Sequence, residues 1–164
     1  MHKHEYVKME FFFKKDLFFL EKITKPKIFN NKKKDFPLTI NTFYAEWCPN
    51  CHYDVKTLKE VINLCSDDLV DFNLIMMLSS DENSINFIKS NNLQIPFKVS
   101  NLKTKNEELF LKTTYGKFKS EVKDERKWGF PLHIINKKEG LKVAVIKGEI
   151  IKKEILEYLN NLIN

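Results

Sequence analysis

Two cysteines three positions apart are the residues of this 164-residue chain whose types and spacing most directly suggest chemistry. Cys48 and Cys51 lie in the stretch "FYAEWCPNCHYDV" (43–55), directly after a run of bulky apolar residues. Thiol–disulfide exchange needs a thiolate nucleophile and a second thiol close enough to resolve the mixed disulfide. A C-x-x-C pair at the amino end of a helix supplies both, because free N–H groups and the helix dipole stabilise the first thiolate. The pair therefore predicts a redox-active dithiol.

The same residues also fit, less well, a haem or a zinc site. Cys48 to His52 satisfies C-x-x-C-H, the haem attachment pattern. A covalent haem, however, needs a pocket that replaces much of the core. A structural zinc normally needs four ligands, and only the remaining cysteine, Cys65, and a few histidines are left to complete a set. In a continuous helix Cys65 lies roughly 21 Å beyond Cys51. We therefore expect no cofactor and no metal, and Cys65 as a small buried hydrophobic residue.

A cysteine protease or peroxidase would need one activated cysteine with an oriented partner. His52 directly follows Cys51 and is expected to point outward, and His133 has no visible partner in the sequence. Neither histidine is predicted to be a catalytic base.

The elements around the pair predict a strand that leads straight into a helix. Residues 35–47 ("DFPLTINTFYAEW") are typical of a buried strand. From Pro49 the apolar residues recur at helical spacing, and proline suits a first helical turn. Cys48 is thus predicted at the amino end of that helix.

The rest of the chain predicts an α/β sandwich with a mixed sheet. The further predicted elements are a buried strand over 69–81, a helix capped by Ser80 or Asp81, a short edge strand around Pro96, a helix over 106–116 that ends at Gly116, a hairpin of 130–136 with 141–148, and an amphipathic helix over 149–163.

In this order, the motifs resemble the thioredoxin superfamily. "FYAEWCPNC" looks like the strand and active site of that family, and "GFPLHIIN" (129–136) resembles the segment with its cis-proline, here Pro131. Residues 146–163 are similar to the closing strand and last helix. The resemblance covers residues 36–164 and implies a thioredoxin-like α/β fold, with a central mixed sheet and helices on both faces. Residues 1–35 would be an amino-terminal extension that could add an edge strand.

The resemblance also implies roles. Cys48 would be the attacking thiol and Cys51 the resolving thiol, while Trp47, Phe130 and Pro131 would bind the substrate. The chain is closest in layout to the TlpA/ResA-like thiol-disulfide oxidoreductases, because the segment before the proline is longer than in a minimal thioredoxin and holds an extra helix.

Two positions depart from that family's pattern. Thr42 occupies the position where thioredoxins proper carry a buried aspartate that assists proton transfer. The residues between the cysteines are Pro49 and Asn50 rather than Gly-Pro. The redox potential and the direction of electron flow are therefore left open.

Charge and hydropathy limit the partners. The net charge is +6, but the lysines are dispersed, and the one tight run, Lys32–Lys34, is expected in a loop, so no nucleic-acid partner is predicted. The longest apolar run, residues 74–78, is too short for an integral membrane span. We read no signal peptide, so a cytoplasmic location is expected, or an extracytoplasmic one if an upstream signal or anchor has been removed.

The sequence thus predicts a monomeric thiol-disulfide oxidoreductase that exchanges the Cys48–Cys51 dithiol with a protein partner and is regenerated by a second redox protein. The alternative is a redox-inactive thioredoxin-like module whose groove at Pro131 docks a partner. A haem carrier is the remaining alternative.

Overall fold

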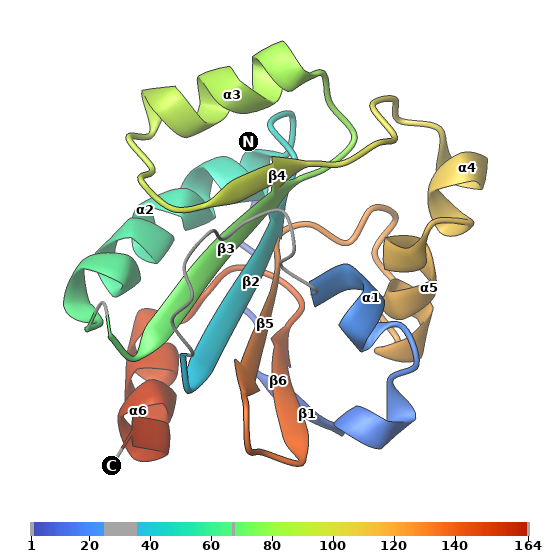
Figure 1. Ribbon diagram of the computed structural model, residues 1–164. Helices are drawn as coiled ribbons and strands as arrows, with labels where there is room; N and C mark the ends of the chain where they lie inside the picture. Colours follow the sequence, from blue (N-terminus) through green and yellow to red (C-terminus); the bar gives the residue numbers. More distant parts are fainter. Residues whose placement is uncertain (1, 25–35, 67, 164) are drawn as a thin grey trace.

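The computed structural model describes residues 2–24, 36–66 and 68–163, in which six strands form one open mixed sheet with helices on both sides (Figure 1). The strands are β1 (Glu10–Phe13), β2 (Leu38–Tyr44), β3 (Val70–Met76), β4 (Phe97–Val99), β5 (Leu132–Lys137) and β6 (Lys142–Ile146). The helices are the 3-10 turn η1 (Lys14–Asp16), α1 (Leu20–Thr24), α2 (Pro49–Leu64), α3 (Asp81–Ser90), α4 (Glu107–Leu111), α5 (Thr114–Glu121) and α6 (Lys152–Ile163).

The strand order is β1-β6-β5-β2-β3-β4. β2, β3 and β4 run parallel to one another, whereas β5 is antiparallel to β2, and β6 is antiparallel to both β5 and β1. Helices α2, α3 and α6 lie on one side of the sheet, and α1, α4 and α5 lie on the other (Figure 1). The predicted α/β fold is confirmed.

The two central parallel strands are hydrophobic because helices cover both of their faces. In β2 and in β3 every residue but one is buried. The edge strands are short, as edges of natural sheets often are; β1 is largely exposed and β4 is partly exposed. β1 shows that part of the amino-terminal extension joins the sheet, beside β6. The loop predicted for the lysine run at 32–34 lies outside the described residues.

Most of the predicted elements are confirmed within a few residues. Helix α3 is capped by Ser80, whose side chain accepts a hydrogen bond from the Asn83 N–H at 3.1 Å. Helix α6 begins at Lys152 rather than at Glu149, because Glu149 is engaged with the amino-terminal segment, in a parallel bridge to Tyr6.

The single helix predicted over residues 106–116 is wrong. The chain forms two short helices here, because the Thr113 side chain accepts a hydrogen bond from the Gly116 N–H at 3.0 Å and starts a second helix. Gly116 therefore lies inside α5 and ends no helix. A Cβ at this position would lie 2.8 Å from the Leu111 Cα, so glycine lets the backbone of α5 pack directly on the end of α4.

Candidate redox site

Cys48 caps the helix that contains Cys51. It has extended backbone angles between β2 and α2, and its Sγ accepts a hydrogen bond from the Cys51 N–H at 3.3 Å. Pro49 occupies the first helical turn, where its missing N–H leaves no unpaired donor. The sulfur of Cys48 therefore sits where the free N–H groups of a helix end converge, as the sequence predicted.

The two thiols have opposite environments. They are unlinked in the structure; 6% of Cys48 is exposed, whereas Cys51 is fully buried. A hydrogen bond with the Cys51 side chain is the largest of the effects that lower the pKa of Cys48, with help from the Cys51 and Asn50 N–H groups. Burial raises the pKa of Cys51 well above that of an ordinary thiol. Because the pKa of Cys48 is lowered and that of Cys51 is raised, the arrangement favours ionisation of Cys48 before Cys51.

The loop before β5 lies against the Cys48 sulfur. The Phe130–Pro131 peptide bond is cis, and the Cys48 Sγ lies 3.6 Å from the Phe130 carbonyl oxygen, to which the thiol donates. Both Phe130 and Pro131 are buried. The structure thus brings together Cys48, Cys51, Phe130 and Pro131, four residues that the sequence analysis assigned to one site.

Two tryptophans border the sulfur. Trp47 is half-buried and is held in place by its indole N–H, which donates to the Leu78 carbonyl oxygen at 2.9 Å. Its ring centroid lies 5.7 Å from that of Trp128 and 6.1 Å from that of Phe130, both in edge-to-face geometry. Sequence reasoning missed Trp128, although its position three residues before Pro131 is a signal that could have indicated it.

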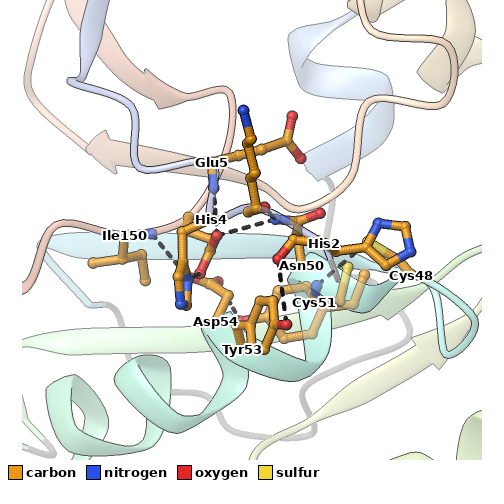
Figure 2. Close-up of polar contacts among 12 residues, drawn as sticks. His2, His4, Glu5, Cys48, Asn50, Cys51, Tyr53, Asp54 and Ile150 are labelled. Atoms are coloured by element: carbon orange, nitrogen blue, oxygen red, sulfur yellow. Dashed lines mark hydrogen bonds and ion pairs between the residues drawn. The ribbon is translucent and has the colours of Figure 1, made fainter.

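The amino-terminal residues 2–7, here called the amino-terminal strap, lie over the start of α2 (Figure 2). The Asn50 amide, between the two cysteines, donates to the Lys3 carbonyl oxygen at 2.8 Å and to the Glu149 carboxylate at 3.1 Å. The same carboxylate accepts the Glu5 N–H at 2.5 Å and contacts His4 Nδ1 at 2.8 Å. The buried carboxylate therefore fixes both the strap and the middle of the C-x-x-C turn.

Aromatic and backbone contacts complete the attachment of the strap. The His4 ring stacks on Tyr6 with centroids 4.8 Å apart and lies 4.4 Å from the ring of Tyr53 on α2. The Glu149 N–H donates to the Glu5 carbonyl oxygen at 2.7 Å. Sequence reasoning did not find this contribution, because the partners are separated by almost the whole chain.

A buried polar network lies one helical turn beyond Cys51. The Asp54 carboxylate accepts hydrogen bonds from the Tyr44 hydroxyl at 2.6 Å and from the Ile150 N–H at 2.7 Å, and lies 2.7 Å from His133 Nε2. His133 is fully buried, and its Nδ1 lies 2.7 Å from the Thr42 hydroxyl. The expectation that His133 lacks a partner is wrong, because the sheet places it opposite Thr42 and beneath α2.

A charged cluster packs beneath Gly129. Arg126 is the chain's only arginine and holds the Asp124 carboxylate by two hydrogen bonds of 3.0 and 2.7 Å. Lys119 Nζ donates to the Asp124 carbonyl oxygen at 2.6 Å. The positive charge of Arg126 also lowers the pKa of Cys48, by less than the hydrogen bonds with Cys51 and Asn50 do.

The other candidates do not join the dithiol. Cys65 is half-buried at the far end of α2, and His52 is exposed, with Nε2 2.6 Å from the Glu46 carbonyl oxygen. Within residues 2–24, 36–66 and 68–163, no three metal-ligating side chains gather as a set. Cys51 is fully buried in the core and therefore does not present its sulfur for attachment of a haem.

No protein-family model matches the chain, and no curated protein matches it significantly. Its fold is similar to that of a thioredoxin-related protein from Neisseria meningitidis serogroup B, at 20% identity and a TM-score of 0.59, over 81% of this chain and 90% of that one. It is also similar to a DsbF homologue from Corynebacterium diphtheriae, at 17% identity and a TM-score of 0.56, over 78% and 73% of the two chains. StoA from Bacillus subtilis matches at 17% identity and a TM-score of 0.54, over 76% and 84%.

Proposed function

We propose that this chain, a member of the thioredoxin superfamily by its fold, is a thiol-disulfide oxidoreductase that acts on a protein partner through Cys48 and Cys51. The observation that carries the proposal is the hydrogen bond from the Cys51 N–H to the Cys48 Sγ at a helix start. It stabilises one thiolate and places the second thiol within one turn of it.

In the reducing direction, the Cys48 thiolate attacks one sulfur of a partner disulfide. The partner S–S bond breaks, its second sulfur leaves as a thiolate and takes up a proton, and a mixed disulfide to Cys48 remains. Cys51 then loses its proton and attacks the Cys48 sulfur, which releases the first partner sulfur as a thiolate. The protein ends with a Cys48–Cys51 disulfide, and two electrons have passed to the partner.

We assign to the Asp54–His133 pair the role of accepting the proton that leaves Cys51. Cys51 must be deprotonated in the second step, although burial raises its pKa. Asp54 lies one helical turn further along α2, and its charge is among the effects that raise this pKa, as expected for a close neighbour. His133 shares the Asp54 carboxylate at 2.7 Å, so the pair offers a buried acceptor for a proton that leaves Cys51.

We assign the extended partner segment to the surface beside Cys48 that Trp47 and the Phe130–Pro131 peptide form. The Phe130 carbonyl oxygen faces Cys48 and, once the Cys48 thiol has ionised, is free to accept an N–H from a substrate strand. We assign regeneration of the dithiol to a second redox protein. No helix of the described part of the chain is long and apolar enough to cross a membrane. A cytoplasmic location and a monomeric state stay predictions from the sequence.

The test is the redox equilibrium of the pair. The protein is equilibrated in graded dithiothreitol or glutathione buffers, and free thiols are counted after alkylation, with Cys48→Ser as the control. A reversible two-electron transition is expected, and Cys51→Ala is expected to accumulate a mixed disulfide with a partner protein. A pair that never closes to a disulfide would overturn the proposal and favour the redox-inactive binding module.

A further inference from the structure

The surface beside Cys48 combines indole rings with lysine ammonium groups. Lys105 Nζ lies 4.0 Å from the centroid of the Trp47 ring, and Lys127 Nζ lies 5.3 Å from the centroid of the Trp128 ring. The two rings contact each other in edge-to-face geometry. An aromatic wall next to the attacking sulfur therefore carries two cations on its surface, each held in place by the face of a ring.

These cations are available to a partner. Lys105 and Lys127 are both exposed, and 65% of the Lys127 side chain is accessible. Lys127 Nζ contacts the Glu107 carboxylate at 3.7 Å, but both side chains are exposed, and ion pairs of this kind are weak in water and salt. The Asp81 carboxylate on the neighbouring helix is bonded to a different lysine, Lys103, at 2.7 Å.

The other border of the dithiol is also basic. Lys3 of the amino-terminal strap is exposed, and its carbonyl oxygen is held by the Asn50 amide between the two cysteines. The Glu149 carboxylate on this side is buried and accepts the Glu5 N–H of the strap. The nearby Glu46 is half-buried, and its carboxylate accepts a hydrogen bond from Ser79 at 3.0 Å. A segment that approaches Cys48 therefore meets exposed positive charge on both sides.

We propose that the partner segment of this protein carries acidic side chains on either side of its reacting cysteine, and that Lys105 and Lys127 recognise them. This inference rests on the proposed function and specifies its substrate class. The apolar part of the segment would pack on Trp47 and Trp128, while its carboxylates would pair with the ammonium groups above the rings. Charge complementarity of this kind mainly raises the rate of encounter and selects against basic partners.

Three peptides test the proposal. Each has one cysteine flanked on both sides by Glu, Gln or Lys, and is activated as its 2-pyridyl disulfide. The Cys48 thiolate attacks the peptide sulfur, the S–S bond breaks, and 2-thiopyridone leaves and is followed by its absorbance. The reduced wild-type chain is expected to react with the Glu peptide about tenfold faster than with the Gln peptide at low salt, and more slowly with the Lys peptide. Near 1 M salt, where the Debye length is about 3 Å, the ratio is expected to approach one.

The variant Lys105→Gln/Lys127→Gln is expected to lose most of the preference for the Glu peptide. Lys142→Gln is a matched control, because Lys142 also lies over an aromatic ring, with Nζ 4.7 Å from the Phe13 centroid. It begins β6 at the opposite end of the sheet from Cys48 and is expected to keep the wild-type preference.

The outcomes separate this proposal from the function on which it rests. Equal rates with the Glu and Gln peptides, or a preference that the double variant retains, would overturn the recognition by lysines and leave the oxidoreductase function intact. A wild-type chain that reacts with none of the three peptides would overturn both.

Discussion

The hydroxyl of Thr42 and Nδ1 of His133 lie 2.7 Å apart, at directly opposite positions of β2 and β5. The other nitrogen of the imidazole lies 2.7 Å from the carboxylate of Asp54 on α2. The position at which the thioredoxin resemblance implied a buried acid is thus neutral in this chain. The buried carboxylate comes instead from the helix that contains Cys51.

Removal of that carboxylate is expected to destabilise the fold strongly. Asp54→Ala leaves the Tyr44 hydroxyl, the Ile150 N–H and the His133 ring without their acceptor in the core. We expect the free energy of unfolding to fall by about 3–5 kcal/mol, as measured by urea denaturation. The exposed Glu157→Ala on α6 is the control and should change it by less than about 0.5 kcal/mol. A loss below about 1 kcal/mol for Asp54→Ala would contradict this account of the network.

Asp54→Asn separates the proposed proton transfer from stability. The amide keeps the size of the side chain but cannot accept a proton at neutral pH. We expect release of the Cys48 mixed disulfide by Cys51 to slow by about tenfold or more, while the first attack by Cys48 changes little. Single-turnover kinetics with a mixed disulfide preformed on Cys48 measure the second step alone. If that step keeps its wild-type rate and pH dependence, Asp54 does not receive the proton.

The reactivity of Cys48 is expected to depend on the side chain of Cys51. The hydrogen bond with that side chain is the largest of the effects that lower the pKa of Cys48. In Cys51→Ala the pKa of Cys48 should therefore rise, so that the thiolate forms at higher pH and iodoacetamide modifies it more slowly at neutral pH. The measurement is the alkylation rate of Cys48 against pH, by mass spectrometry. Cys65→Ser, at the other end of α2, should leave the midpoint unchanged, and an equal midpoint in Cys51→Ala would refute the prediction.

Glu149→Gln is expected to loosen the amino-terminal strap. The Glu5 N–H and the Asn50 amide both donate to Oε2 of this carboxylate, whereas His4 Nδ1 contacts Oε1. A glutamine oxygen in the Oε2 place accepts these hydrogen bonds without the negative charge that strengthens them, and an NH₂ group in that place would face two donors. Hydrogen exchange at the Glu5 amide should become about tenfold faster or more. Glu154→Gln is the matched control, because the Glu154 carboxylate accepts a hydrogen bond from the Met9 N–H at 3.1 Å, just beyond the strap. It should leave the Glu5 amide protected, and full protection in Glu149→Gln would count against the role of this carboxylate.

Gly148→Ala should move the strap by steric means. A Cβ at this position would lie 2.7 Å from the Val7 Cγ2 and would overlap the Glu5 carbonyl oxygen. We expect a loss of about 1–3 kcal/mol in the free energy of unfolding, together with faster exchange at the Glu149 N–H that bonds to Glu5. Gly140→Ala in the β5–β6 turn meets no atom closer than 3.3 Å and is expected to cost less. Equal losses of unfolding free energy in the two variants would show that the close approach of the strap to Gly148 has no steric importance.

The local elements around the dithiol could be predicted from the sequence, because their signals are local. Each signal lies within one helical turn or one strand of the residues that it positions. Examples are the apolar residues at helical spacing after Pro49, the capping residue Ser80 and the strand that ends before Cys48. The break between α4 and α5 was missed, because a glycine that ends a helix and a glycine that lets two helices pack closely have the same local sequence.

The supporting shell of the site could not be predicted in this way. Asn50 and Glu149 are 99 residues apart in sequence, and Thr42 and His133 are 91 apart. Such pairs depend on the order and register of the strands, which periodicity does not determine. Trp128 was missed for a similar reason, because its contact with Trp47 exists only once the loop before β5 returns to the start of α2.

The contact between Trp47 and Trp128 also gives the molecule a built-in optical reporter. The sequence contains two tryptophans, and both rings belong to the wall beside Cys48. All indole fluorescence of the chain therefore arises within this one site. The proposed closure of the disulfide or binding of a partner would change the surroundings of the same two emitters, so the intrinsic emission would report on this end of the molecule without any attached label.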